Sequence, residues 1–251
     1  MLPHDELGSG LAVVLLHAGI ADRTMWSDHL RPLAQAGYRA VALELPGFGE
    51  APLPEGRYAP WAEVLGTMDE LDIERAALVG NSMGADVALR VAVVAPDRVS
   101  RLVLCSARAP GAEPSPELKA AWEAEMAAFE SGDVDGAVAA VVDAWTLPDA
   151  PTALRERVAA MQRRTYELQG EDVELDEAPD PVKQDPTALT RLAVPALVAA
   201  GEHDKPDFRE GAEALARTLP HARHVVIDGA GHLAPLERPE AFRELVLGFL
   251  S

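Results

Sequence analysis

A serine at position 82 has a glycine two residues away on either side, in the segment GNSMG at residues 80–84. This G-x-S-x-G pattern is typical of an activated serine nucleophile in a tight turn between a strand and a helix. An apolar run at residues 76–79 and a helix-like stretch at residues 83–94 supply that setting. The glycines leave room for a strained backbone at the serine. We predict Ser82 as the nucleophile; the alternative is that it only caps the helix.

A serine nucleophile needs a neighbouring base. His232 stands in the glycine-rich loop at residues 229–233, directly after an apolar run. That position puts a histidine at the carboxyl edge of a sheet, where sites in open α/β folds form. His221 and His224 fall before or inside the preceding run, so we interpret them as surface or strand residues. His232 is therefore the predicted base.

The carboxylate that orients the base should follow another strand. An apolar run at residues 194–200 is followed by GEHD at residues 201–204, which offers two acids. We predict Asp204, because it lies deeper in the loop and its short side chain can turn back to the histidine. Glu202 is the reserve acid. The competing interpretation of Asp204 is a helix cap.

An oxyanion hole needs two backbone N–H donors. Met83, directly after the serine, supplies the first. The loop after the apolar run at residues 11–17 supplies the second, with Gly19 as the predicted donor and Ile20 as the alternative. His17 in this loop is interpreted as a structural residue.

Short apolar runs alternate with amphipathic stretches along most of the chain. This alternation predicts a doubly wound α/β domain with a mostly parallel sheet. Runs rich in Val, Leu and Ala suit strands that are covered on both faces. The predicted strands are residues 11–17, 38–44, 76–80, 99–105, 194–200 and 224–227. The predicted helices are residues 24–36, 60–71, 83–94, 207–218 and 239–250.

The alternation is interrupted once, by an Ala-rich insertion without strand-like runs. Helical stretches near residues 115–130, 133–145 and 152–169 predict a helical cap. We divide the chain into a core of residues 1–106 and 186–251 and a cap of residues 107–185. The end of the insertion, residues 171–185, has seven acidic residues and one lysine, and is interpreted as a solvated linker.

Five segments together resemble the α/β-hydrolase superfamily: LHAG at 16–19, LPGFGE at 45–50, the serine turn, GEHD at 201–204 and GH at 231–232. More narrowly, they are similar to small bacterial hydrolases related to 3-oxoadipate enol-lactonase and to meta-cleavage product hydrolases. The motifs occur in the family's order and leave mainly the cap unmatched. As a set they are specific for the fold and much less specific for the substrate.

Three departures from the family pattern matter. Ala18 replaces a usual glycine, Glu44 replaces a frequent aspartate, and only residues 1–10 precede the first core strand, where relatives usually have an antiparallel strand pair. We therefore expect an α/β-hydrolase fold with about six parallel strands and at most one short N-terminal strand.

The resemblance implies a serine hydrolase that cleaves a carboxylic ester or lactone through an acyl-enzyme, with a small-molecule substrate, water and no cofactor. Alternatives are a meta-cleavage C–C hydrolase, a cofactor-free haloperoxidase-like enzyme, or a non-catalytic hydrolase-like binding module. No spacing motif supports a metal site. We expect a small or medium, mostly apolar substrate in a pocket lined by Trp26, Trp122, Met126 and Trp145.

Composition limits the remaining classes. A formal charge of −19 opposes binding to nucleic acid. The single cysteine, Cys105, excludes an internal disulfide and is interpreted as a buried strand residue. Apolar runs are far shorter than a membrane span requires, and no secretory leader is evident, so we expect a cytoplasmic protein without membrane contact. The oligomeric state is left open.

Overall fold

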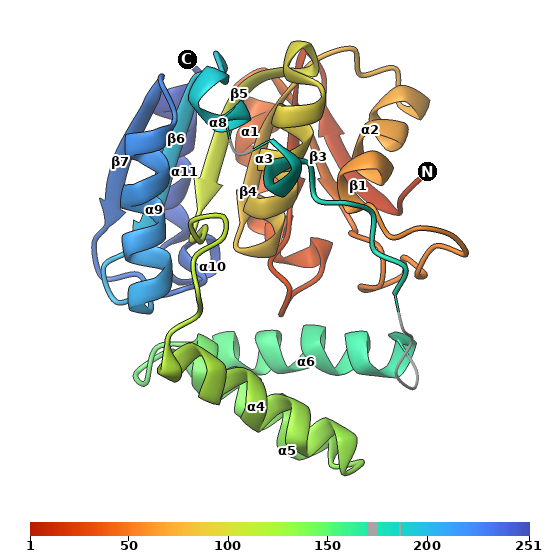
Figure 1. Ribbon diagram of the computed structural model, residues 1–251, viewed down its shortest axis with the longest axis vertical. Helices are drawn as coiled ribbons and strands as arrows, with labels where there is room; N and C mark the ends of the chain where they lie inside the picture. Colours follow the sequence, from red (N-terminus) through yellow and green to blue (C-terminus); the bar gives the residue numbers. More distant parts are fainter. Residues whose placement is uncertain (170–174, 186) are drawn as a thin grey trace.

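A seven-stranded sheet forms the centre of the part of the chain that the computed structural model describes, residues 1–169, 175–185 and 187–251 (Figure 1). The strands are β1 (His4–Gly8), β2 (Leu11–Leu16), β3 (Tyr38–Leu43), β4 (Ala76–Asn81), β5 (Val99–Cys105), β6 (Ala196–Gly201) and β7 (Ala222–Ile227). Their order is β1-β3-β2-β4-β5-β6-β7. β1 is antiparallel to β3, and every other neighbouring pair is parallel. The predicted fold class, with parallel strands and one short N-terminal strand, is confirmed.

The central strands β2 and β4 are nearly continuous apolar runs because both faces of the sheet are covered there. Val14 and Leu16 of β2 belong to the apolar cluster on one face. Val13 and Leu15 belong to the cluster on the other face. Side chains alternate along a strand, so each of the strands β2 to β6 contributes to both clusters. In β4 all six residues are buried.

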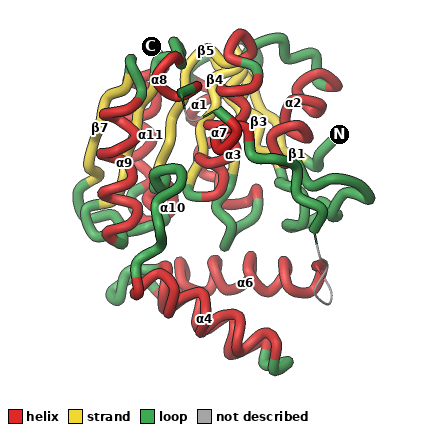
Figure 2. The backbone as a smooth tube through the Cα atoms, in the orientation of Figure 1, coloured by secondary structure: helices red, strands yellow, loops and turns green. Residues whose placement is uncertain are grey.

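Helices cover the two faces in the doubly wound manner (Figures 1 and 2). One face carries α2 (Pro60–Glu70), α3 (Met83–Val94) and α9 (Pro206–Thr218), whose apolar residues join the first cluster. The other face carries α1 (Ser27–Gln35) and α11 (Pro239–Leu250). The shorter helices are η1 (Arg23–Trp26), η2 (Pro96–Arg98), α7 (Pro181–Gln184), α8 (Ala188–Arg191) and α10 (Ala234–Glu237).

Three longer helices lie apart from the sheet, at the bottom of Figure 1: α4 (Pro116–Glu130), α5 (Val134–Trp145) and α6 (Thr152–Gln169). They pack on one another in chain order. We call them the cap. α7 packs on α3 of the core, with Val182 buried, so the chain returns to the core slightly before residue 186.

The predicted acidic linker lies partly outside the described residues, which omit 170–174. Its described part bonds to the core. Tyr58 N–H donates to the Asp176 carbonyl at 2.7 Å, and Ala178 N–H donates to the Tyr58 carbonyl at 2.9 Å. Asp180 forms an ion pair with Arg90 at 2.7 Å. This part is therefore bonded to the core, while most of its residues are exposed to solvent, in keeping with its interpretation as a solvated linker. Within the described chain, every helix is too short or too polar to cross a bilayer.

Candidate active site

Ser82 lies in the turn between β4 and α3, with φ of 53° and ψ of −118°. A non-glycine residue with positive φ is strained and persists only where its surroundings enforce it. Here the neighbours approach too closely for any side chain at the flanking glycines. A Cβ on Gly80 would lie 2.3 Å from the carbonyl carbon of Gly84, and one on Gly84 would lie 2.2 Å from the Leu16 carbonyl oxygen. The two glycines therefore allow α3 to start against β4 and β2.

We expect Gly80→Ala to lower the free energy of unfolding by about 1–3 kcal/mol, the usual cost of overpacking. The new methyl group would meet backbone atoms, which cannot move aside cheaply. Gly66→Ala is a matched control, because a Cβ there meets nothing within 4 Å and the residue lies inside α2. Alanine is favoured over glycine in a helix, so this variant should be as stable as wild type or more so. Urea unfolding measures both; equal midpoints for Gly80→Ala and wild type contradict the prediction.

Asp204 and His232 are in direct contact. Asp204 Oδ1 lies 2.9 Å from His232 Nδ1, and both side chains are buried. Asp204 Oδ1 also accepts from the Lys205 N–H at 2.8 Å, which fixes the carboxylate. Because a carboxylate accepts, Nδ1 carries the proton and Nε2 is left as the free acceptor. That tautomer is the one that a general base requires.

Glu202, the reserve acid, lies two residues before Asp204, in the same turn after β6. Its Oε2 accepts from the Gly229 N–H at 2.9 Å, and its side chain is 51% exposed. The side chain thus supports the loop that carries His232 from outside. Asp204 alone of the two carboxylates contacts the imidazole.

The backbone of His232 is held by two side chains that the sequence did not indicate. Asn81 Nδ2 and Ser106 Oγ both donate to the His232 carbonyl, at 3.2 and 3.1 Å. Glu237 Oε2 accepts from the adjacent Gly231 N–H at 2.7 Å, and burial raises the pKa of this carboxyl. Ser106 follows β5 directly, at the same sheet edge as Ser82. Its position at the end of a predicted strand could have identified Ser106 from the sequence as a residue of the site.

Gly19 lies beside Met83 in the lining of the cavity that also contains Ser82. A Cβ on Gly19 would be 3.6 Å from the Met83 side chain. The Gly19 loop is tied down by His17, whose Nδ1 lies 2.9 Å from the Ala18 carbonyl and whose Nε2 accepts from the Leu45 N–H at 2.9 Å. Burial lowers the pKa of His17, so it stays neutral and structural.

Glu44 is fully buried behind this loop. It accepts from the Arg23 N–H at 2.7 Å and the Glu50 N–H at 3.2 Å, and it forms an ion pair with the Arg23 guanidinium. A buried carboxylate needs such partners. Glu44, which stands where relatives often have the shorter aspartate, therefore links the end of β3 to Arg23 and to Glu50.

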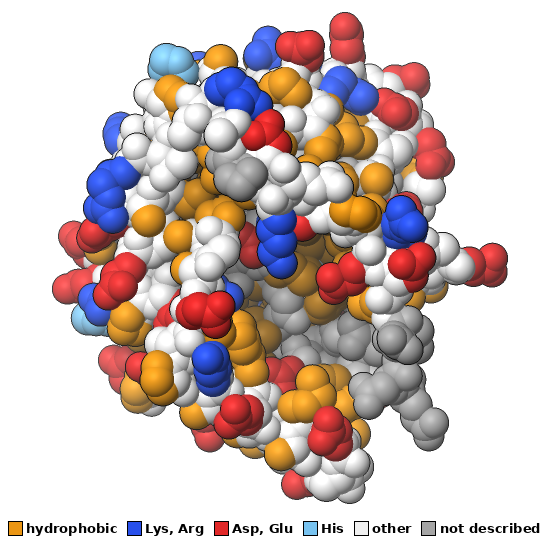
Figure 3. Space-filling view, in the orientation of Figure 1, with side chains coloured by type: hydrophobic (Ala, Val, Ile, Leu, Met, Phe, Trp, Pro, Cys, Tyr) orange, Lys and Arg blue, Asp and Glu red, His pale blue; other side chains and the backbone are white. Residues whose placement is uncertain are grey.

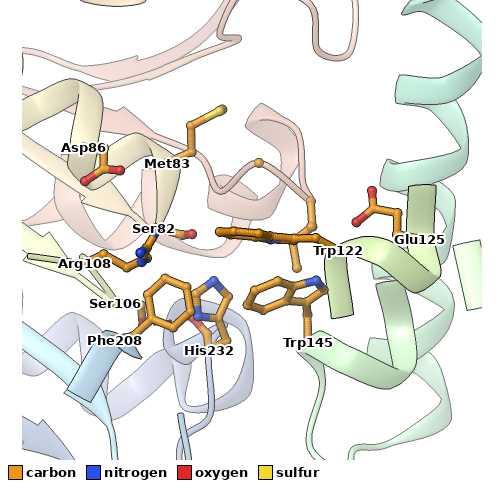
Figure 4. Close-up of a pocket in the computed structure, with 12 residues that line it drawn as sticks. Ser82, Met83, Asp86, Ser106, Arg108, Trp122, Glu125, Trp145, Phe208 and His232 are labelled. Carbon is orange, nitrogen blue, oxygen red and sulfur yellow. Dashed lines mark hydrogen bonds between the residues drawn. The ribbon is translucent and has the colours of Figure 1, made fainter. Parts of the chain in front are cut away.

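Ser82 and His232 line one cavity of about 270 Å³, between the core and the cap. Figure 3 shows the surface hollowed there. In Figure 4, Trp122 and Trp145 come from the cap side, as part of the lining. The complete lining is Gly19, Ile20, Ser82, Met83, Asp86, Ser106, Arg108, Trp122, Glu125, Trp145, Phe208 and His232. The sequence did not predict five of these residues, and the cavity is more polar than expected: Asp86, Ser106, Arg108, Glu125 and Phe208.

Two predicted pocket residues lie elsewhere. Trp26 is fully buried in the core, with its ring 5.9 Å from that of Phe242 on α11. Its indole packs among buried core residues and does not belong to the cavity lining. Met126 is 50% exposed on α4 and does not belong to the lining. It lies one helical turn beyond Trp122, but its side chain is turned to solvent, whereas the adjacent Glu125 lines the cavity.

Burial raises the pKa of Asp86, in the cavity lining, to about 6 from its ordinary 3.8. Because the folded-state pKa is the higher one, ionisation costs stability, and the cost grows as pH rises from about 4 to about 6. We expect Asp86→Asn to gain stability over wild type at about pH 8 but not below about pH 4. The side chain is 41% exposed, so the gain should stay under about 1 kcal/mol. Melting temperatures of both proteins across this range test it; a pH-independent difference contradicts it.

Two other chemistries receive no support from these side chains. Burial raises the pKa of Cys105 to about 12, which keeps its thiol protonated and unreactive. Among the described residues, no three His, Cys, Asp or Glu side chains come together as a metal site would need.

Comparisons with known proteins agree with this fold. A family model described as the alpha/beta hydrolase fold matches residues 12–239. The 2-hydroxy-6-oxo-6-phenylhexa-2,4-dienoate hydrolase of Comamonas testosteroni is 30% identical over 100% of this chain and 91% of its own. A thermophilic esterase from Thermogutta terrifontis superposes with a TM-score of 0.80 at 27% identity, covering 99% of this chain and 92% of its own. The enol-lactonase of Burkholderia xenovorans gives 0.80 at 25% identity, covering 99% and 96%.

Proposed function

The chain belongs to the alpha/beta hydrolase fold family, and from that premise we propose that it hydrolyses a carboxylic ester or lactone through an acyl-enzyme on Ser82. One observation carries this proposal: the Asp204–His232 hydrogen bond of 2.9 Å, on the cavity that also contains the strained Ser82. A buried carboxylate that orients a histidine beside a serine is the arrangement that activates a serine hydroxyl.

The proposed reaction has two halves. Nε2 of His232 takes the proton of Ser82 Oγ as the oxygen attacks the acyl carbon. The backbone N–H groups of Gly19 and Met83 stabilise the resulting oxyanion. His232 then protonates the leaving oxygen, and the acyl group stays on Ser82. In the second half His232 activates water, which releases the acid and restores the serine. Asp204 stabilises the imidazolium in both halves.

The cavity supports a small or medium substrate. Ile20, Met83, Trp122, Trp145 and Phe208 give it an apolar wall. Its charged side chains, Asp86, Arg108 and Glu125, suit a polar group next to the apolar part. This modifies the expectation of a mostly apolar substrate.

A second candidate is hydrolysis of a carbon–carbon bond in a ring-cleavage dienoate. The observation that favours it is the Comamonas testosteroni relative, a dienoate hydrolase by name, which aligns along the whole chain at 30% identity. The same serine, histidine and aspartate would serve, because the bond that breaks is again attached to an acyl carbon.

The experiment compares kcat/KM for p-nitrophenyl esters, an enol-lactone and a 2-hydroxy-6-oxo-dienoate with one enzyme preparation. Higher kcat/KM for the ester or lactone supports the proposal, and a dienoate preferred by tenfold or more replaces it with the second candidate. Labelling of wild type by a fluorophosphonate tests the shared mechanism. Neither labelling nor turnover of any substrate would leave a non-catalytic binding module as the better description.

A further inference from the structure

The imidazole of His232 lies against two aromatic side chains, Trp145 and Phe208, which also contact each other (Figure 4). Its ring centroid is 4.5 Å from that of Trp145 and 4.3 Å from that of Phe208, and these two rings are 5.8 Å apart. Both aromatic side chains are buried. Phe208 belongs to α9 of the core, whereas Trp145 is the last residue of α5 in the cap. The cap thus supplies one of the two aromatic rings that contact the base.

We propose that Trp145 is a positioning residue for His232, through which the seating of the cap sets the orientation of the base. The inference rests on the proposed function, because it concerns the same proton transfer from Ser82. The hydrogen bond to Asp204 holds only Nδ1 of the ring. A ring held at one atom can still turn about that contact, which displaces Nε2. The rings of Trp145 and Phe208 lie against the imidazole and restrict this rotation.

The end of α5 is fastened at the loops that carry the acid and the base. Lys205, next to Asp204, has its Nζ 5.5 Å from the Trp145 ring centroid and 3.2 Å from Glu117 Oε1 on α4. Leu147, just past Trp145, packs on the residue before His232. A Cβ added to Gly231 would lie 3.0 Å from Cδ2 of Leu147. These contacts couple the position of the Trp145 indole to both loops.

The indole acts through its ring faces. Among the described residues, its Nε1 has no hydrogen-bond partner. Trp145 and His232 also both border a second cavity, of about 280 Å³, whose lining does not include Ser82. The indole therefore helps to separate the two cavities, and its loss would give the imidazole room to swing toward the second one. An aromatic face also favours the imidazolium that forms during catalysis.

The test compares Trp145→Leu, which removes the flat ring, with Trp145→Phe, which keeps one. We expect Trp145→Leu to lower kcat by about 10- to 100-fold, the scale of a displaced catalytic group, with KM within about threefold. The rate of fluorophosphonate labelling should fall in parallel. Trp145→Phe should recover most of both losses. Phe129→Leu is the matched control: its ring packs on Tyr166 within the cap, 4.7 Å away, and kcat should change less than about twofold.

A raised KM with unchanged kcat in Trp145→Leu would show that the indole is only a substrate wall, which overturns the inference. So would equal losses in the Leu and Phe variants. If Trp145→Leu does not fold, Trp145→Met, which fills similar space without a flat face, takes its place. Failure of the proposed function looks different, because wild type itself would neither label nor turn over substrate.

Discussion

Replacing Ser82 with alanine is expected to lower kcat by a factor on the order of 10⁵ and leave KM within about threefold. The change removes the atom that forms the acyl-enzyme but keeps the shape of the cavity. The remaining activity would come from the oxyanion donors and the bound substrate alone. The Ser82 side chain makes no capping hydrogen bond to α3, so the fold should survive. Steady-state kinetics with the best substrate, alongside circular dichroism, measures the effect.

Ser106→Ala is the matched control, because Ser106 is the other serine in the cavity lining. Its hydroxyl donates to the His232 carbonyl, and Asn81 keeps a second donor there. Loss of one of two such bonds should reduce kcat only a few-fold. A fluorophosphonate should still label this variant and fail to label Ser82→Ala. Labelling that disappears with Ser106 and persists without Ser82 would falsify the assignment of the nucleophile.

The parts of the fold that the sequence predicted well are those that local patterns determine. β4 and α3 could be predicted because a strand buried on both faces is an apolar run, and because the close approach of Gly80 and Gly84 demands glycine. β1 could be predicted only as a short strand, because its residues are mostly polar and three of the five are exposed at the sheet edge.

The lining of the cavity was harder to predict, because it depends on where the cap is placed on the core. Trp26 and Trp145 look alike in the sequence, yet one indole packs on Phe242 in the core and the other on the ring of His232. Hydrophobic spacing shows that a helix face is buried but does not show against what. Arg108 and Glu125 were missed for the same reason, since charged residues in a helical insertion are usually solvated.

Asp204→Asn should lower kcat by about 10³- to 10⁴-fold, the loss typical when the acid of such a triad becomes an amide. An asparagine oxygen can still accept from the Lys205 N–H, so the turn should keep its shape. The lost quantity is the negative charge next to Nδ1, which fixes the tautomer and stabilises the imidazolium. Kinetics at two pH values above the inflection of the wild-type profile would separate this loss from a shifted titration.

Glu202→Gln completes the comparison, since the two carboxylates leave the same turn only two residues apart. A glutamine oxygen can still accept from the Gly229 N–H, and the half-exposed side chain has no contact with the imidazole. We therefore expect kcat to change by less than about threefold, as for a loop contact at the surface. A larger loss for Glu202→Gln than for Asp204→Asn would mean that the base is oriented by the outer carboxylate during turnover. The 2.9 Å contact between Asp204 and His232 predicts the opposite order.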